Sequence, residues 1–372
     1  MGVRSLSRRD PAVASIIRAW RELTDHLPPS RPRRTLIACS GGADSCALAL
    51  ALASSTSPDL IIAHIVHDLR PRAEADADRD AAAALAAALS APFVEAAIKV
   101  KVGRGNVEAR ARRERYAALR TLALSHGCPF VATAHHADDQ LETMLMALLR
   151  GAGPRGLRGI ARVRRLGRPA EPTIQIIRPM LGTIDGRARA VGHAECERIC
   201  QRAGWVWRED QTNRDISLLR NALRIDVIPK LKRLRPRAAE QAVAAAAIQH
   251  ELAALAGREA DAIAKLSSEH GTGWAREALR DHPPVVIGEA LTSSIMRATN
   301  GRARDHLGHR TLGPIVRAIR DHSTEPRRFI LSGGVVVEVT AHHIHILAPS
   351  STVNSFPCPN SSPLQLSPRT RP

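Results

Sequence analysis

Short apolar runs alternate with longer stretches of helical pattern through the first half of the chain. The apolar runs are rich in aliphatic residues, end in polar residues, and cover positions 34–39, 60–66 and 130–134. The helical stretches cover positions 44–53, 73–89, 106–125 and 138–149. Continuous apolar strands that alternate with helices of this length are typical of a buried parallel sheet with helices on both faces. The sequence therefore predicts an α/β fold, in which ligands bind beyond the carboxyl ends of the strands.

The pattern changes after residue 150. Residues 151–179 are rich in Gly, Arg and Pro and show no periodicity, which predicts a loop or a flexible arm. Helical patterning returns over residues 186–231 and again over 237–320. Three short strands are then predicted, at positions 329–331, 335–339 and 343–347.

These changes divide the chain into four predicted regions. They are an N-terminal extension (1–33), the α/β domain (34–232), a smaller, mainly helical domain with a short β element (233–349) and a disordered Ser/Pro-rich tail (350–372). The basic segment around Pro236 marks the boundary between the two domains.

The charge of the chain points to a polyanionic partner. The formal net charge is +18 over 372 residues, and residues 151–232 alone hold 17 Lys+Arg against 8 Asp+Glu. Lys and Arg gain affinity for nucleic acid by releasing counterions from its phosphates. Half of the excess charge therefore lies in a segment that we expect to contact nucleic acid.

The cysteines and the apolar runs indicate the cellular compartment of the protein. Six cysteines are scattered along the chain without a C-x-x-C pair, which favours free thiols over a disulfide framework or a zinc site. No stretch approaches the roughly 20 apolar residues of a membrane span. The first residues contain no apolar leader segment. A cytoplasmic protein without a membrane partner is expected.

A glycine turn follows the first predicted strand and opens the first predicted helix. It reads S-G-G-A-D-S and comprises Ser40, Gly41, Gly42, Ala43, Asp44 and Ser45. Glycines let the backbone approach a phosphate oxygen, and the N–H groups of a helix start form an anion cradle with the serine hydroxyls. Asp44 beside phosphate indicates a Mg²⁺ ion between them. The alternative is an ordinary turn in which Asp44 stabilises the helix start.

A second polar cluster follows the third apolar run, so we expect it at the same edge of the sheet. It contains His135, His136, Asp138, Asp139 and Glu142. Asp138 and Glu142 are four residues apart and therefore share a helix face. Such carboxylates could hold Mg²⁺, which makes Asp139 a second candidate metal ligand with Asp44, or bind and deprotonate an amine. The alternative is an acidic helix N-terminus with solvated histidines.

Two basic clusters are candidate phosphate contacts. The first is the Gly-rich segment 151–160, with Arg155 and Arg158, which suggests a mobile clamp. The second is Arg220 and Arg224, which lie on one helix face. The alternatives are a flexible surface connection for the first and structural ion pairs for the second.

Together these segments resemble a known family. S-G-G-A-D-S resembles the PP-loop of the N-type ATP pyrophosphatases, and the run from His135 to Ile160 is similar to the signature of tRNA(Ile)-lysidine synthetases. Supporting matches lie at residues 64–70, 106–116, 178–181 and 209–229. The likeness is close over about residues 34–232. One departure is Asp68, which stands where the family usually has glycine.

The resemblance implies a two-step reaction. ATP with Mg²⁺ would bind at Ser40–Ser45 and adenylate the C2 oxygen of the wobble cytidine in an isoleucine tRNA with a CAU anticodon. The ε-amine of free lysine would then displace AMP and give lysidine. Asp138, Asp139 and Glu142 suit reception and deprotonation of the lysine ammonium. His135, Arg110 and Arg115 are candidates for steadying the adenylate. Members of the family are often dimers, so a homodimer stays open.

Three other functions are compatible with parts of the sequence. A sulfur-transferring PP-loop enzyme would ordinarily need a cysteine pair, which is missing from the sequence. A small-molecule ligase would not need the basic segment 151–232. A non-catalytic, ATP-sensing RNA-binding protein would tolerate loss of the carboxylates between Asp138 and Glu142, whereas an enzyme would not.

Overall fold

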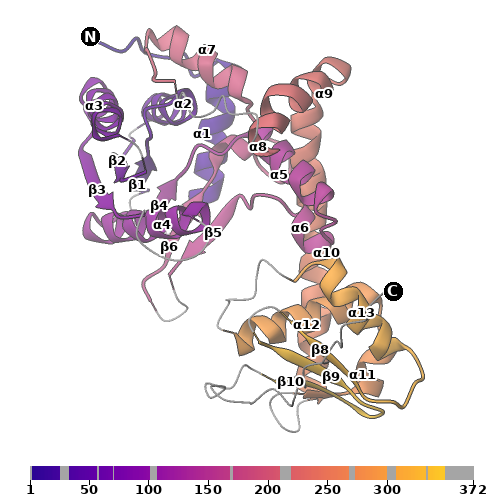
Figure 1. Ribbon diagram of the computed structural model, residues 1–372. Helices are drawn as coiled ribbons and strands as arrows, with labels where there is room; N and C mark the ends of the chain where they lie inside the picture. Colours follow the sequence, from indigo (N-terminus) through magenta and orange to yellow (C-terminus); the bar gives the residue numbers. More distant parts are fainter. Residues whose placement is uncertain are drawn as a thin grey trace, which may run out of the picture. The chain divides into compact units, whose positions relative to one another are not determined.

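The computed structural model describes residues 2–25, 33–56, 58–69, 71–100, 107–167, 171–209, 219–267, 273–299, 307–331 and 334–347. The chain folds as two compact units, residues 1–255 and 256–372 (Figure 1). The division falls within helix α10 (Ala238–Ser267), which begins after the predicted boundary at 232/233. The predicted tail, 350–372, lies outside the described residues. No described helix is both long enough and apolar enough to cross a lipid bilayer.

The first unit is built on a six-stranded sheet in the order β3-β2-β1-β4-β6-β5. Its strands are β1 (Thr35–Ala38), β2 (Leu60–His67), β3 (Phe93–Ile98), β4 (Phe130–Ala132), β5 (Val163–Leu166) and β6 (Ile174–Ile177). Every neighbouring pair is parallel except β5 with β6. The predicted α/β fold is confirmed.

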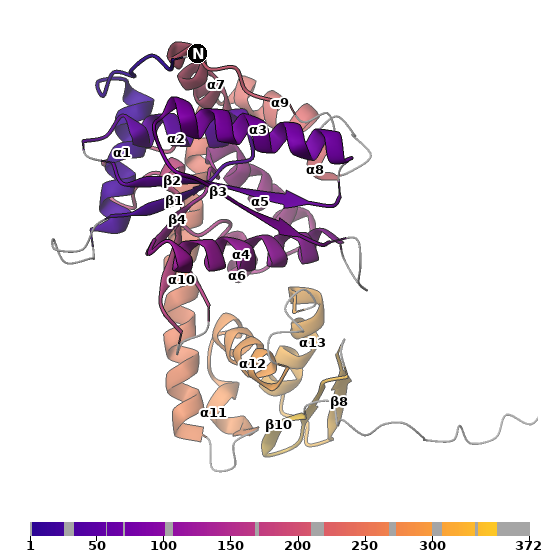
Figure 2. The ribbon, with the colours of Figure 1, turned by 90° about the vertical axis from the view of Figure 1, so that its left-hand side faces the viewer.

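Helices cover both faces of this sheet, as Figure 2 shows for α2 and α3 on one side and α4 on the other. Alternate strand residues explain the two layers: Ile37 and Ile62 pack in one core, and Leu36 and Ile61 in the other. The helices of the first core are α1 (Pro11–Thr24), α2 (Ala43–Ala53), α3 (Arg72–Ala88) and α7 (His193–Ala203). The second core is covered by α4 (Val107–Ser125).

Helix α1 lies in the segment predicted as an N-terminal extension. Asp10 caps it by accepting from the N–H groups of Ala12 and Val13, and Pro11 occupies its first turn. Its apolar face is buried in the first core, where Trp20 donates a hydrogen bond from Nε1 to Thr35 Oγ1 at 3.0 Å. Residues 11–24 are thus a part of the α/β unit.

The prediction of a loop over residues 151–179 was wrong. This segment holds the short helix α6 (Pro154–Leu157), the antiparallel strand β5 and the parallel strand β6. Strand β6 belongs to the sheet because Ile174, Ile176 and Ile177 are buried in its two cores. A helical layer completes the unit: α5 (Ala137–Leu149), η1 (Pro179–Leu181), α8 (Leu219–Ala222), the π-helical η3 (Leu223–Val227), α9 (Ile228–Leu234) and the first part of α10.

The second unit combines helices with a four-stranded antiparallel sheet in the order β7-β10-β9-β8. Its elements are the end of α10, β7 (Gly273–Ala275), α11 (Arg276–Arg280), α12 (Pro284–Ala298), α13 (His309–Arg320), β8 (Arg327–Ile330), β9 (Val336–Val339) and β10 (His343–Leu347). The predicted mainly helical region with a short β element is confirmed. Strand β7 was not predicted.

A buried arginine organises this unit. Arg276 is 2% exposed and donates to the carbonyl oxygens of Ala318, Ile319 and Asp321 at the end of α13, and to the Asp321 carboxylate at 2.7 Å. A cation at this position satisfies helix carbonyls that have no partner within the helix. Arg276 therefore joins the start of α11 to the end of α13.

Candidate functional site

The S-G-G-A-D-S turn links β1 to α2. Gly41 has φ +86°, a left-handed conformation that favours glycine, and Gly42 is the N-cap of α2 without a side-chain cap. Ser45 shapes the turn: its Oγ accepts from Ser40 N at 3.1 Å and donates to Gly42 O at 3.0 Å. The first N–H groups of α2 are thus not covered by a capping side chain, as an anion cradle requires.

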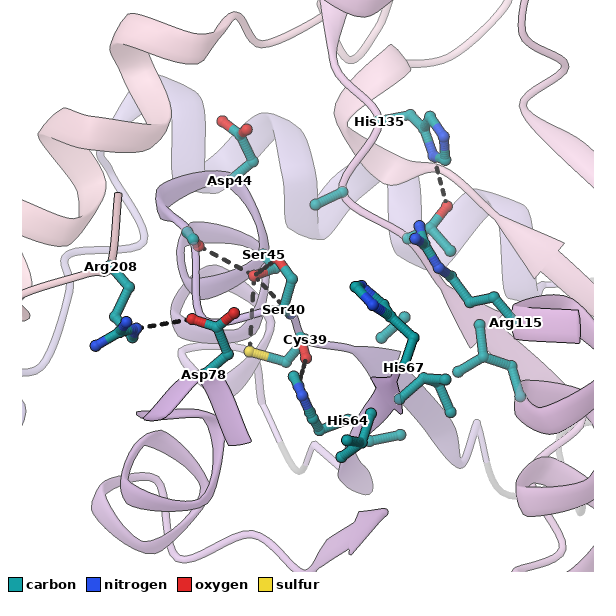
Figure 3. A pocket seen from close by; sticks show the side chains of 18 of the residues that line it. Cys39, Ser40, Asp44, Ser45, His64, His67, Asp78, Arg115, His135 and Arg208 are labelled. Atoms are coloured by element: carbon teal, nitrogen blue, oxygen red, sulfur yellow. Dashed lines mark hydrogen bonds and ion pairs between the residues drawn. The ribbon is translucent and has the colours of Figure 1, made fainter. Parts of the chain in front are cut away.

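Two residues from distant segments support this turn from outside. Arg208 donates from its backbone N–H to Gly41 O at 3.0 Å and from Nε to Asp78 Oδ1 at 2.7 Å (Figure 3). A Cβ on Gly41 would lie 3.3 Å from Asp78 O. Asp78 of α3 and Arg208 therefore fix the turn and leave little room for a larger residue.

A cavity of about 380 Å³ opens beside the turn, at the carboxyl ends of β1, β2 and β4 (Figure 3). Several predicted site residues line it: Ser40, Gly42, Asp44, Ser45, Arg115, His135, Asp139 and Arg220. The predicted sharing of one sheet edge by the glycine turn and the second polar cluster is therefore what the structure shows. Its position agrees with the rule for ligand binding in parallel sheets.

His135 presents a neutral imidazole to the cavity. Its Nδ1 lies 3.4 Å from Arg178 Nε, which donates to it, and 3.0 Å from Thr133 Oγ1. Burial, together with the Arg178 guanidinium, lowers the pKa of His135 to about 3. Because Nδ1 accepts, the ring proton lies on Nε2, and His135 is a hydrogen-bond donor at neutral pH.

Asp44 forms ion pairs with two histidines. Its Oδ1 lies 2.7 Å from His193 Nδ1, and its Oδ2 lies 3.4 Å from His136 Nε2. Burial opposes ionisation of Asp44, but the hydrogen bonds from His136 and His193 outweigh it and hold the pKa of this carboxyl well below its usual range. Burial likewise opposes protonation of His136, yet the carboxylates of Asp139, Asp44 and Asp138 raise its pKa to about 9.

The three predicted carboxylates of α5 have different partners. Asp139 forms a capping box with His136 and pairs with Arg224 at 3.2 Å. Asp138 accepts hydrogen bonds from Lys232 Nζ at 2.7 Å and from His193 N at 2.8 Å. Burial raises the pKa of Asp138, but these two hydrogen bonds outweigh it, so the pKa lies below its usual value. Among the three, only Asp139 lines the cavity.

Glu142 is the most buried of these carboxylates, with a side chain that is 1% exposed. It pairs with Arg224 at 2.9 Å and accepts a short hydrogen bond from Arg220 Nε. Arg220 and Arg224 thus join α8 and η3 to α5. The structural ion pairs that were the alternative explanation for these two arginines are present, and Arg220 also faces the cavity.

The remaining predicted site residues lie away from the cavity lining. Arg110 is buried and donates from Nε to Val100 O at 2.7 Å. Arg155 and Arg158 belong to α6 and its C-cap, where Arg158 donates to Arg155 O at 3.1 Å. Gln140 anchors the following turn by accepting from Ile160 N at 2.8 Å. This Gly-rich segment therefore has defined contacts with α5.

Asp68, which stands where the family usually has glycine, accepts a hydrogen bond from Val100 N at 2.6 Å.

Several residues of the site were not predicted. His193, Arg178, Tyr116, Lys232 and Arg208 contact predicted residues or line the cavity. Arg178 is 2% exposed. Burial of an arginine suggests a functional role only when its neighbours in the fold are known, and the sequence does not give them. His193 lies 149 residues from Asp44 along the chain, so no local pattern marks it.

Comparison with known proteins agrees with this geometry. The family model described as the PP-loop domain matches residues 16–231. A tRNA(Ile)-lysidine synthase of Geobacter sulfurreducens is 34% identical over 74% of this chain and 57% of its own length. One of Alkalilimnicola ehrlichii is 36% identical over 73% and 55%. One of Deinococcus deserti is 33% identical over 90% and 56%.

The chain thus spans a little over half the length of these curated relatives. Among solved structures, a U34-tRNA thiolase of Methanococcus maripaludis matches with a TM-score of 0.49 and 13% identity, over 64% of this chain and 79% of its own. The glycine turn at the sheet edge and the match over residues 16–231 lead to one conclusion: the chain belongs to the PP-loop domain family.

Proposed function

We propose that this chain is a cytoplasmic ATP-dependent ligase that joins lysine to C2 of the wobble cytidine in the isoleucine tRNA with a CAU anticodon. The observation that carries the proposal is the single cavity shared by the Ser40–Ser45 turn, His135 and Asp139. An anion cradle, a neutral donor and a carboxylate in one cavity are the groups that a nucleotidyl transfer followed by amine attack requires. The relatives named tRNA(Ile)-lysidine synthase support the same substrate.

In the first step, the cytidine O2 attacks the α-phosphorus of ATP and pyrophosphate leaves. The N–H groups at the start of α2 and the Ser40 hydroxyl would hold the departing phosphates, because a helix start favours anions. His135 would donate from Nε2 to the reacting cytidine or phosphoryl oxygen. Arg115, which lines the same cavity, would balance the negative charge.

In the second step, the ε-nitrogen of lysine attacks C2 and AMP leaves with the former O2. Free lysine is an ammonium with a pKa of about 10.4 and must lose a proton before it attacks. Asp139, the one α5 carboxylate that lines the cavity, would receive the amine and take this proton. Asp138 and Glu142 do not line the cavity; they pair with Lys232 and with Arg220 and Arg224, and would act by positioning Asp139, which also pairs with Arg224.

The residues present suit a Mg²⁺ ion. Asp44 Oδ2 and Asp139 Oδ2 approach the same His136 nitrogen at 3.4 and 3.5 Å, so two carboxylates stand together beside the phosphate cradle. Carboxylate oxygens are the ligands that Mg²⁺ prefers. Asp44 and Asp139 would hold the ion, which neutralises triphosphate charge when bound.

Basic residues at the cavity and beyond it suit the tRNA backbone. Arg155 and Arg158 are candidate phosphate contacts of the first unit, together with the solvent-facing parts of Arg220 and Arg224. A homodimer stays a prediction from the resemblance.

The test is a product assay with purified full-length chain, ATP, Mg²⁺, lysine and a CAU-anticodon isoleucine tRNA transcript. We expect pyrophosphate and AMP in equal amounts and lysidine in the digested tRNA. A transcript with a GAU anticodon is the matched control and should give none. Pyrophosphate release that is the same without tRNA, or a tRNA product that contains sulfur in place of lysine, would contradict the proposal.

A further inference from the structure

Three side chains from three separate elements meet at the start of α2. Asp44 belongs to the first turn of α2, His136 is the N-cap of α5, and His193 is the first residue of α7. Each residue offers one potential metal ligand, a carboxylate oxygen or an imidazole nitrogen, and these three atoms lie within 4.8 Å of one another. The two imidazole rings have a centroid separation of 5.8 Å, with the Asp44 carboxylate in contact with both.

We propose that Asp44, His136 and His193 form a binding site for a transition-metal cation of the Zn²⁺ or Co²⁺ type. Two imidazoles with one carboxylate are a donor set that Zn²⁺ takes with an open fourth position. Imidazole nitrogen favours such cations over Mg²⁺, which prefers oxygen ligands. The two histidines therefore give this site a selectivity that the carboxylates alone would not have.

Further carboxylates face the second nitrogen of each ring. His193 would ligate through Nδ1, and its Nε2 lies 3.5 Å from Glu197 Oε1. His136 would ligate through Nε2, and its Nδ1 lies 4.0 Å from Asp138 Oδ2. A carboxylate that accepts a hydrogen bond from the second ring nitrogen orients a metal-bound imidazole; Glu197 lies at the limit of that distance and Asp138 beyond it. Ligation would place the ring proton of His136 on Nδ1 and end the 3.3 Å contact from Asp139 N.

The backbone around His193 is held firmly. His193 N donates to Asp138 Oδ2 at 2.8 Å, and a Cβ on Gly192 would lie 2.8 Å from the same oxygen. Helix α7 is also tied to α2, because Cys200 Sγ donates to Ala43 O at 3.4 Å. His136 itself is 4% exposed. The three ligands are thus presented by packed elements, which favours a preformed site.

Occupation of this site would compete with nucleotide binding. Asp44 would be shared between the transition metal and the Mg²⁺ of the proposed ATP site, so this consequence rests on the proposed function. Binding of the cation itself does not, since it needs neither ATP nor tRNA.

The experiment is a Co²⁺ titration of the untagged full-length chain after chelator treatment. We expect visible d–d absorption that saturates at one equivalent, is displaced by Zn²⁺, and is not displaced by an equal concentration of Mg²⁺. His193→Asn should weaken Co²⁺ binding at least about 10-fold, as loss of even an outer-shell partner does. Asp44→Asn should do the same. His126→Asn, at an exposed histidine after α4, should leave the affinity unchanged.

Three results would overturn the proposal. They are the lack of a saturable signal, an affinity that His193→Asn does not change, and an intense near-ultraviolet thiolate band. The last would assign the metal to cysteines, of which Cys196 is the nearest to His193 on α7. None of these outcomes bears on the tRNA product assay, so the metal site and the proposed ligase activity can fail separately.

Discussion

Asp44 and Asp139, from two different helices, place a carboxylate oxygen 3.4 and 3.5 Å from the same nitrogen, His136 Nε2. One buried imidazole thus holds together the glycine turn after β1 and the acidic helix after β4. Two carboxylates would repel each other here without a cation between them. The surrounding carboxylates outweigh burial and raise the pKa of His136 to about 9, so the protonated ring supplies that cation. Its Nδ1 then carries a proton, and the 3.3 Å contact in which Nδ1 accepts from Asp139 N belongs to the neutral ring. Protonated His136 therefore offsets part of the negative charge of Asp44 and Asp139 before any substrate binds.

The first prediction concerns Asp44. Asp44→Asn should lower the rate of tRNA-dependent pyrophosphate release on the order of 100-fold, comparable to losing one preorganised group that stabilises transition-state charge. The measurement is single-turnover pyrophosphate release at saturating ATP. Asp59→Asn is the control, because Asp59 pairs with Arg34 at 2.9 Å and does not line the cavity. Equal rates for the two variants would refute a role for Asp44.

The second prediction separates strain from function in the glycine turn. Gly41→Ala and Gly127→Ala both force alanine into a left-handed conformation, at φ +86° and +63°. Each should lose about 1–2 kcal/mol of stability. Only Gly41→Ala should also weaken ATP binding, because its Cβ would press on Asp78 O at 3.3 Å, whereas nothing lies within 4 Å at Gly127.

Urea unfolding gives the stability of both variants, and equilibrium binding of a non-hydrolysable ATP analogue gives the affinity. If Gly127→Ala weakens the analogue as much as Gly41→Ala does, the turn is not the nucleotide cradle.

The third prediction concerns the buried carboxylate of α5. Glu142→Gln removes the negative charge of the carboxylate that pairs with Arg220 and Arg224. The substitution should lower the free energy of unfolding by about 1–3 kcal/mol. Hydrogen exchange should become faster in residues 219–227, which these arginines attach to α5. Glu108→Gln is the matched control: Glu108 also pairs with Arg220, at 3.3 Å, but its side chain is 78% exposed. That variant should stay within about 0.5 kcal/mol of the parent.

The fourth prediction is a pH dependence in the second unit. Burial raises the pKa of the Asp321 carboxyl, but hydrogen bonds from Arg327, Ser323 N and Arg276 outweigh it. The pKa of Asp321 therefore lies below its usual value of 3.8. A carboxyl with a lowered folded-state pKa contributes stability above its unfolded pKa and loses it as pH falls through the folded value. The protection factors of β9 and β10, which are exchange rates corrected for the intrinsic rate at each pH, should therefore decrease at pH values below about 4 in the parent chain.

Asp321→Asn should show faster exchange than the parent at neutral pH, and the difference should shrink as the pH falls below that range. A difference that is the same at every pH would show that the Asp321 charge does not contribute.

The main strands of the α/β fold could be predicted because buried parallel strands consist of consecutive apolar residues. Strands β1 and β2 are continuous apolar runs, as buried parallel strands are. Strand β6 was missed because its four residues lie in a segment dominated by Gly, Arg and Pro. The prediction of an extension over residues 1–33 does not include helix α1, although Val13, Ile16, Ile17 and Trp20 follow helical spacing.

The candidate site could be predicted only where its residues adjoin a motif. The turn at Ser40–Ser45 and the cluster from His135 to Glu142 were found because each follows an apolar strand. His193, Arg178 and Lys232 were missed because their partners are 149, 43 and 94 residues away in sequence. Ion pairs at such separations depend on tertiary packing, which no periodic pattern reports.

The position of β5 at one border of the sheet bears on how two copies of the chain could associate. This strand forms one border of the six-stranded sheet, and a border strand offers unpaired backbone groups to other chains. Its two central residues are arginines: Arg165 is exposed, and Arg164 lies 4.4 Å above the Tyr116 ring. Neighbouring guanidinium groups would repel a second copy that approached edge to edge. A self-association that joined two β5 borders into one continuous sheet is therefore disfavoured.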